Sequence, residues 1–264
     1  MESLIRIFKL AIPKRVKKYV LYAINVFSAQ EKNKIYASFH PKINLIPKGY
    51  CKGKRCFIIG GGPSINEMDL SPLSNEYCIA VNRGFLLKEK GLGYVEFYGL
   101  SDYNAYKEYG QKISPDFAKH FCIFGSIPWE NDRIRSASFF SMYSEHSTEK
   151  FMSNGFFQFD LNKPVAHTYT VALQMLQVAV HAGFKDIYFI GIDNDFSGTN
   201  MHFYADSEAE KKNMREWQFN PCPDNENAFG QAYKILKGRG VNLYNAGVGG
   251  KLMALPRVNF TDLF

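Results

Sequence analysis

Short apolar runs alternate with helical patterns over most of this chain after residue 54, and this alternation limits the fold more than any other feature of the sequence. Six of the runs are nearly continuous in apolar character, which is typical of strands that are covered on both faces. They are residues 55–60, 77–82, 94–99, 120–125, 186–191 and 241–246. The pattern predicts an α/β domain with an open, mostly parallel sheet and helices on both faces, which is a Rossmann-like fold.

The clearest helical pattern lies directly before one of these runs. Residues 168–183 carry apolar side chains at helical spacing, and Gly183 is a typical stop signal. With 264 residues, 46% of them apolar, the chain can bury one sizeable core. We therefore expect one catalytic domain over residues 51–264. Residues 126–166 are poorly periodic and should form an insertion or lid near the ligand-binding edge.

The first run ends in a turn of three glycines, Gly60, Gly61 and Gly62. Ligands of open parallel sheets bind at the carboxyl ends of the strands, so this turn is a candidate site. Glycines allow a ligand to approach the backbone closely, and Ser64 with Glu67 has capping-box spacing. We expect a helix N-terminus here, with free amides that suit an anion. The alternative is a tight connection that binds nothing.

The glycine turn is not a dinucleotide fingerprint. Ile65 stands where that motif has its third small residue, and Asn82 ends the second run, where an acidic residue would hold a ribose. A neutral amide suits a nucleobase or a sugar. The alternative is that Asn82 is a turn residue, stabilised by bonds to its own backbone.

Acidic residues follow two other strands on the same edge. Asp102 comes after the third run, and Asp193 comes after the run at 186–191. Carboxylates in these places can bind a divalent cation or orient hydroxyl groups. The alternative for Asp193 is a cap on the turn that follows.

Other polar and glycine residues belong to the same predicted edge. His202 lies in a polar loop, and histidine is the usual residue for removing a proton near neutral pH, although a loop histidine can be merely solvated. Thr168 and Thr170 open the predicted helix, where hydroxyls and amides can meet a phosphate. Gly249 and Gly250 lie in a flexible loop after the last run, which is also compatible with an anion.

A family resemblance rests on five runs taken in order: KGKRCFIIGGGPSINEMDLSPL, AVNRGFLL, YGLSDY, HTYTVALQMLQVAVHAGFKDIYFIGIDNDF and NAGVGGKL. Together they resemble the 6-hydroxymethylpterin diphosphokinase-like domain, which is found in proteins of bacterial surface-polysaccharide gene clusters. The resemblance spans about residues 50–264. More distantly, GGGPS, VNRGF and the unit ending in GID are similar to the bacterial sialyltransferases of glycosyltransferase family 42.

The resemblance to family 42 implies a Rossmann-like enzyme that transfers a nonulosonic acid from its CMP-activated form, without an essential metal. It also implies that Gly60–Gly62, Ser64, Thr168 and Thr170 line the nucleotide phosphate site. Asn82 would then meet the cytidine or the sugar.

The same resemblance implies a histidine base, but the chain departs from the family at that position. Family 42 has its catalytic histidine before the last helix, where this chain reads NPCPDNENAFGQAYKIL. Either His202 or an acid such as Asp102 replaces it, or the chemistry differs.

The basic charge of the chain is concentrated near its start. Residues 1–55 hold 13 of the 32 Lys and Arg residues but only 2 of the 25 Asp and Glu residues. The remainder is mildly acidic, which argues against nucleic-acid binding. Residues 3–27, within an N-terminal segment over 1–50, read as a basic amphipathic helix with too many charges to span a membrane. We expect peripheral contact with an anionic membrane surface; the alternative is packing on the domain or on another subunit.

The five cysteines are an odd number without zinc-site spacing, and Cys56, Cys78 and Cys122 fall in apolar runs, which favours reduced cytosolic thiols. The leading hypothesis is an inverting glycosyltransferase without a required cofactor. It would use a nucleotide-activated, CMP-linked sugar to extend a glycan or lipid-linked glycan of lipopolysaccharide or capsule, at the cytoplasmic face of the membrane. The alternatives are a diphosphotransferase with Mg²⁺ at Asp102 and Asp193, or a non-catalytic nucleotide-binding scaffold. Homo-oligomer formation is left open.

Overall fold

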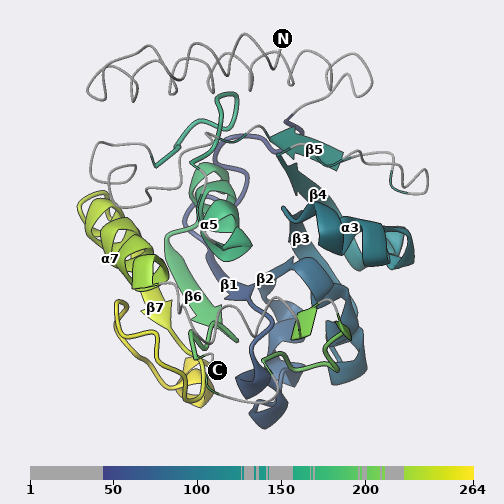
Figure 1. Cartoon of the computed structure of the whole chain (residues 1–264). Coiled ribbons are helices and arrows are strands. Elements are labelled where there is room, and N and C mark those ends of the chain that lie inside the picture. Colours follow the sequence, from purple (N-terminus) through teal and green to yellow (C-terminus); the bar gives the residue numbers. More distant parts are fainter. Residues whose placement is uncertain are drawn as a thin grey trace, which may run out of the picture.

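The computed structural model confirms the α/β class. It describes residues 44–125, 127, 134, 137–140, 142, 157–166, 168, 170–195, 197, 201–208, 210–211 and 223–264. Within these residues, all strand pairs of the sheet are parallel, and the strand order is β5-β4-β3-β2-β1-β6-β7 (Figure 1). The expected basic helix at residues 3–27 lies outside the described residues.

The six expected strands are present within two residues of their predicted bounds. They are β1 (Arg55–Ile59), β2 (Tyr77–Val81), β3 (Val95–Leu100), β4 (Ala118–Phe124), β6 (Asp186–Ile190) and β7 (Asn242–Asn245). An additional edge strand, β5 (Ala137–Phe140), lies within the expected insertion at residues 126–166. Residues 137–140 are therefore part of the sheet. Whether the undescribed residues of the insertion form a lid stays a prediction.

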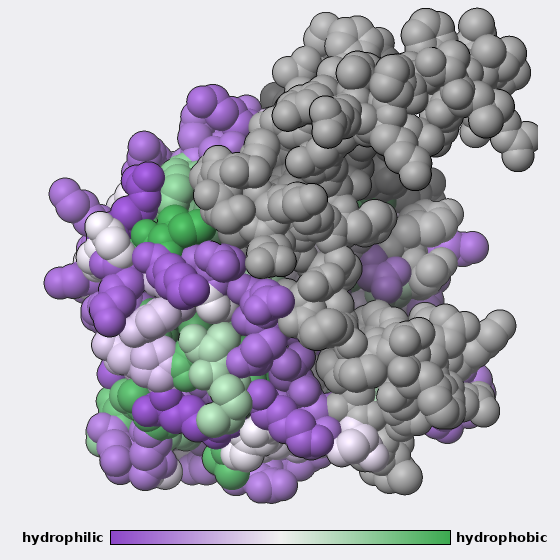
Figure 2. Space-filling model, turned by 60° about the vertical axis from the view of Figure 1, so that its left-hand side comes forward, coloured by the Kyte–Doolittle hydropathy of each residue, from purple (hydrophilic) through white to green (hydrophobic). Residues whose placement is uncertain are grey.

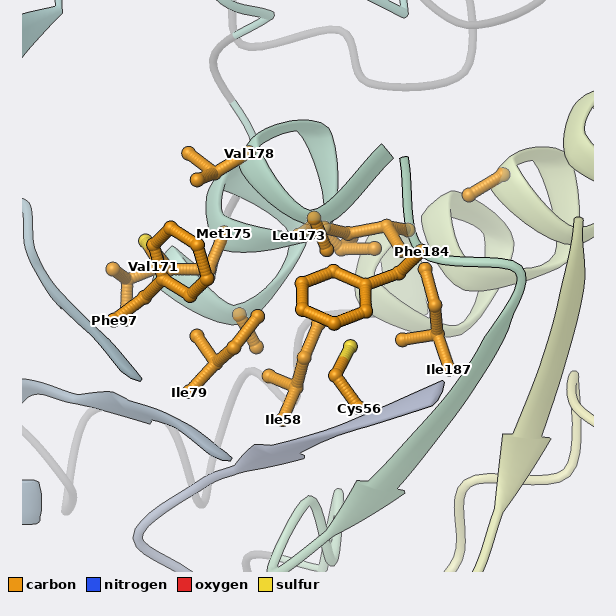
Figure 3. Packing of buried hydrophobic residues seen from close by; sticks show 14 of the residues in the cluster. Cys56, Ile58, Ile79, Phe97, Val171, Leu173, Met175, Val178, Phe184 and Ile187 are labelled. Atoms are coloured by element: carbon orange, nitrogen blue, oxygen red, sulfur yellow. The ribbon is translucent and has the colours of Figure 1, made fainter. Parts of the chain in front are cut away.

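Two helices cover one face of the sheet. The helix α5 (Val171–Ala182) lies across β1, β2 and β3, and α7 (Pro223–Lys237) lies beside β7 (Figure 1). In Figure 3, Ile58 and Ile79 of the sheet point toward Leu173 and Met175 of α5. All four side chains are fully buried, so this face holds a continuous hydrophobic core.

The other face of the sheet is covered mainly by short helices. Alternate residues of β1 divide between the two faces, so that Ile58 packs under α5 while Phe57 and Ile59 belong to the second core. The second face is covered by α3 (Tyr103–Tyr109) and by the 3₁₀ helices η1 (Pro63–Glu67), η2 (Ser71–Asn75), η3 (Asn82–Lys90) and η5 (Pro115–Phe117), and the short η4 (Gly110–Lys112) follows α3. A further 3₁₀ helix, η6 (Phe260–Leu263), adds Phe260 to the same core.

Buried polar side chains of α5 hold a segment without regular structure, residues 157–166. The Gln177 amide accepts hydrogen bonds from the backbone N–H of Gln158 (3.2 Å) and of Ala166 (2.8 Å), and it donates to the Ala166 carbonyl (3.0 Å). His181 lies 3.2 Å from the Ile46 carbonyl, and Ile46 itself is buried in the core. The described residues before position 51 therefore pack on the same core as the sheet.

The surface on the side of α7 and β7 is mostly hydrophilic, with small, separate hydrophobic areas (Figure 2). Scattered apolar side chains of this kind are normal on soluble proteins. No helix in the described ranges combines the length and the apolar character that crossing a membrane requires.

The strand order fixes where a ligand site is expected. From β1 the chain builds β2 to β5 on one side of β1 and then returns to place β6 on its other side. The carboxyl ends of β1 and β6 therefore flank the point where the order reverses, which is where open α/β sheets bind their ligands.

Candidate functional site

The glycine turn after β1 packs directly on the backbone that follows β6. Ile59 pairs with Ile190, and the N–H of Gly62 donates to the carbonyl of Gly191 (2.8 Å). A Cβ atom on Gly62 would lie 2.8 Å from that carbonyl oxygen, and one on Gly60 would overlap it. These glycines are required by the close approach of two backbone segments.

Asp193 holds the start of η1 and replaces the expected capping box. Its carboxylate accepts one hydrogen bond from the Ser64 N–H (2.9 Å) and one from the Ser64 hydroxyl (2.5 Å). Gly62 is the N-cap residue, and its position has no side-chain cap. The prediction of free amides is therefore wrong for Gly62 and Ser64, because Gly191 and Asp193 already accept their protons. Anion binding at Gly60–Gly62 and Ser64 stays a prediction.

The loop after β7 closes over the same aspartate. Gly250 has a φ of +72°, and its backbone packs on Asp193, while the N–H of Lys251 donates to the Asp193 carbonyl (2.6 Å). The Arg257 guanidinium donates to the carbonyls of Gly247 (3.3 Å), Gly249 and Gly250 (3.2 Å). This loop is therefore held at several points, although we expected it to be flexible.

His202 lies against the glycine turn. The N–H of Phe203 donates to the Gly61 carbonyl (2.9 Å), and the Asn66 side chain donates to the Phe203 carbonyl (3.1 Å). A Cβ atom on Gly61 would lie 3.0 Å from His202 Cδ2. The structure thus brings His202 to the carboxyl end of β1, at the point where the strand order reverses.

Asp206 orients the His202 ring, and this residue was missed in the sequence. Its buried carboxylate, 3% exposed, lies against His202 Nδ1 at hydrogen-bond distance, and it also accepts from the N–H of Met201 (3.3 Å). A carboxylate only accepts hydrogen bonds, so in the neutral form of the ring Nδ1 carries the proton and Nε2 has the lone pair. The ring is 28% exposed, and the described residues supply no hydrogen-bond partner to Nε2. This arrangement can remove a proton from a hydroxyl group.

A complete capping box follows His202, at a position that the sequence reasoning did not consider. The Ser207 hydroxyl accepts from the N–H of Glu210 (3.3 Å), and the Glu210 carboxylate accepts from the N–H of Ser207 (2.8 Å). The spacing Ser-x-x-Glu, and the spacing of four residues between His202 and Asp206, are the signals that could have located these residues.

Asp102 caps the helix that follows its strand, and it lies close enough to Tyr109 to add to the effect of burial in raising the pKa of that hydroxyl. Its carboxylate accepts from the N–H of Ala105 at the start of α3 (3.2 Å), which is a capping role. Its strand, β3, lies three strand spacings from β6, or about 14 Å. Asp102 and Asp193 are therefore bonded to different parts of the fold. Among the described residues, no group of three or more His, Cys, Asp or Glu side chains gathers in a metal-binding arrangement.

The remaining candidates have local roles at the same edge. Thr170 caps α5 by accepting from the N–H of Ala172 (3.3 Å), and the Thr168 hydroxyl donates to the Thr170 carbonyl (2.8 Å). Asn82 has a φ of +49°, and its carbonyl accepts from the Tyr98 hydroxyl (2.5 Å). The side-chain Oδ1 of Asn82 is buried without a hydrogen-bond partner.

The fold and the edge that carries His202 define a Rossmann-like domain with a candidate site where its strand order reverses. Among solved structures, the chain is similar to the MAf glycosyltransferase from Magnetospirillum magneticum AMB-1, with a TM-score of 0.54 and 17% sequence identity. The match covers 89% of this chain and 39% of the other, so this chain spans about two fifths of the length of that protein. At this identity the similarity concerns the fold.

Two sialyltransferase structures also match, each with a TM-score of 0.40. One is CstII from Campylobacter jejuni, solved in complex with the substrate analogue CMP-3FNeuAc, at 18% identity over 73% of this chain and 79% of that chain. The other is a mammalian sialyltransferase at 10% identity, over 75% of this chain and 70% of that chain. No protein-family model matches the chain, and no curated protein does. The resemblance to the pterin diphosphokinase-like family stays a prediction.

Proposed function

We propose that this chain is a glycosyltransferase that takes a nucleotide-activated sugar as donor. The observation that carries the proposal is the His202–Asp206 pair, held against the glycine turn at the carboxyl end of β1. A sheet of this topology binds ligands at that edge. The fold similarity to the MAf glycosyltransferase supports the same class of reaction.

In the proposed reaction, His202 is the base that removes the proton from the acceptor hydroxyl through Nε2. Asp206 keeps the proton on Nδ1 and stabilises the positive charge that the ring then acquires, as an orienting carboxylate does in other enzymes. The acceptor oxygen attacks the anomeric carbon with inversion, and the nucleotide leaves with its phosphate. Asp102, the other candidate base, caps α3 and is not needed for this step.

We assign the donor to the CMP-linked class, and the acceptor to a glycan or lipid-linked glycan of the bacterial surface. The basic amphipathic sequence at residues 3–27 supports a place at the cytoplasmic face of the membrane. Asn82, at the end of the neighbouring strand β2, has an unsatisfied side-chain oxygen that suits an N–H donor of a base or an amide group of a sugar.

The test uses purified full-length chain with CMP-N-acetylneuraminic acid, and it measures release of CMP with and without a glycan acceptor. UDP-linked sugars and ATP with Mg²⁺ are run in parallel. We expect CMP release and a rise in the melting temperature with CMP, because a ligand that binds only the folded state stabilises it. His202→Ala should lower turnover by about 10²- to 10⁴-fold, which is the usual contribution of a general base.

His120→Gln is the matched control, because this half-buried histidine of β4 contacts Tyr50 and Phe97 away from the glycine turn. It should leave turnover unchanged. A chain that neither binds nor hydrolyses CMP-linked sugars would refute the donor assignment. Transfer of diphosphate from ATP with release of AMP, in a reaction that requires Mg²⁺, would support the diphosphotransferase, and nucleotide binding without turnover would support the scaffold.

A further inference from the structure

Arg83 forms the centre of a charged and aromatic cluster beside the His202 loop. It is the second residue of η3, directly after β2, and its side chain is 12% exposed. The guanidinium donates a hydrogen bond to Glu108 of α3 (2.5 Å), and its Nε lies at ion-pair distance from Glu210 (3.0 Å) without hydrogen-bond geometry. It also lies over the rings of Tyr109 (4.9 Å) and Tyr204 (5.4 Å).

Tyr204 connects this cluster to His202. The two rings are stacked, with centroids 4.8 Å apart and planes inclined by only 5°. The Tyr204 hydroxyl donates to Glu210 (3.2 Å), which is the same carboxylate that Arg83 binds. Burial raises the pKa of Tyr204, so the hydroxyl keeps its proton and remains a donor. A continuous set of contacts therefore runs from Arg83 through Tyr204 to the imidazole.

Arg83 also supplies the positive charge that compensates the carboxylates of Glu108 and Glu210. Glu108 and Glu210 both face it, and the Ser207 hydroxyl donates to Glu108 (3.3 Å), which ties the loop to α3. Without the guanidinium, two carboxylates would share a partly buried place without a cation, which is unfavourable. The segment that carries Tyr204 and Glu210 would then move away from α3.

We propose that Arg83 is a positioning residue for the candidate base. Its guanidinium holds Tyr204 and Glu210 in place, and the Tyr204 ring fixes the plane of the His202 imidazole while Asp206 fixes its rotation. Nε2 is thereby kept aimed at the place of the acceptor hydroxyl. The catalytic part of this inference rests on the proposed function, whereas the positioning part concerns the free protein.

The first experiment measures positioning without any substrate. In protein labelled with ¹³C and ¹⁵N histidine, the signals of His202 are assigned by their loss in His202→Ala. The stacked Tyr204 ring shifts the His202 ring protons, so Tyr204→Leu should move these signals. We expect Arg83→Met to move them in the same direction and to change the ring ¹⁵N shifts that report the Nδ1–H tautomer. Arg83→Lys, which keeps the charge but loses the planar fork, should give an intermediate shift.

Arg239→Met is the matched control, because Arg239 also lies over an aromatic ring, that of Phe159 (4.1 Å), but follows α7. It should leave the His202 signals unchanged. Unchanged signals in both Arg83→Met and Arg83→Lys would overturn the proposal, whatever the activity. If Arg83→Met does not fold, Arg83→Lys decides the question alone.

The second experiment measures kinetics with the donor that the assay of the proposed function identifies. A displaced base lowers the rate of the chemical step, so we expect Arg83→Met to reduce kcat by about 10- to 100-fold with little change in the KM for the donor. Arg83→Lys should restore part of the loss. Normal kcat in Arg83→Met would overturn the catalytic part of the inference. If the wild type has no activity but the His202 signals move as expected, the proposed function fails while the positioning stands.

Discussion

Replacing Gly62 with alanine tests whether the glycine turn is required by contact or by backbone conformation. Gly62 has φ −62° and ψ 150°, which any residue adopts, and this region is also the one preferred before a proline such as Pro63. Backbone strain therefore contributes nothing to the effect of Gly62→Ala. A new Cβ atom, however, would lie 2.5 Å from Asp193 Oδ2 and 2.8 Å from the Gly191 carbonyl oxygen.

The loss of stability in Gly62→Ala depends on how far the Gly191 backbone and the Asp193 carboxylate can move to make room for the new Cβ atom. Ordinary contacts of a Cβ atom begin near 3.4 Å, so the Gly191 backbone must retreat by about 0.6 Å and the Asp193 carboxylate by more. Asp193 cannot turn away without weakening its two bonds to Ser64. Overpacking of this kind costs about 1–3 kcal/mol, and a bond to a charged group contributes about 1.5–3 kcal/mol. After the lower entropy of the unfolded alanine chain is included, about 2–3 kcal/mol of stability should be lost.

Thermal unfolding measures this loss. For a chain of this size, the expected decrease of the melting temperature is about 4–12 °C. Gly93→Ala is the control, because a Cβ atom there would meet nothing within 4 Å, and it should leave the melting temperature unchanged or raise it slightly. Equal melting temperatures for Gly62→Ala and Gly93→Ala would show that the turn and the β6 end do not touch as described.

Two further predictions concern the hydrogen bonds between Ser64 and Asp193 and the buried thiol of Cys78. The Ser64→Ala and Asp193→Asn variants should be non-additive in denaturant unfolding, with a coupling energy of about 1–2 kcal/mol, whereas additive losses would contradict a direct bond between them. Burial raises the pKa of the Cys78 thiol to about 12, so at pH 8 only roughly one molecule in ten thousand carries the thiolate. Iodoacetamide at pH 8 should therefore leave Cys78 unmodified in the native protein, as judged by peptide mass spectrometry, and should modify it once denaturant is added.

Most of the sheet could be predicted because its strands are buried on both faces. A run such as residues 187–190 is apolar throughout, so it signals a strand without knowledge of its neighbours. The edge strand β5, Ala137–Phe140, was missed because it lies within residues 126–166, a stretch that we interpreted as an insertion since its apolar residues are poorly periodic. The helix expected after Gly62 is a five-residue 3₁₀ helix, and the acceptor for the Ser64 amide and hydroxyl is Asp193, which is 129 residues away. Local spacing cannot reveal a partner at that separation.

The sequence predicted where the candidate site lies, but it did not predict which hydrogen bonds the residues of the site form. The sequence located Gly61, Asp193 and His202 at one edge of the sheet, since each follows a predicted strand or lies in a loop soon after one. It did not show that Ser64 and Thr170 would have their hydroxyls occupied within the fold. A hydroxyl group that could bind a ligand can equally well bond to the backbone of its own chain. Only the three-dimensional structure shows which of the two it does.

His202 differs from those residues in a way that bears on function. Ser64 and Thr170 complete bonds that the fold needs, whereas the His202 ring is held on three sides, by Asp206, Tyr204 and the Gly61 turn, and none of the residues that the structure describes bonds to its Nε2. Holding a partly exposed histidine so closely costs side-chain entropy that an ordinary loop residue would not lose. A cluster that fixes the ring and leaves one nitrogen available is what a proton acceptor requires, and it makes His202 a stronger candidate than any carboxylate that the sequence offered.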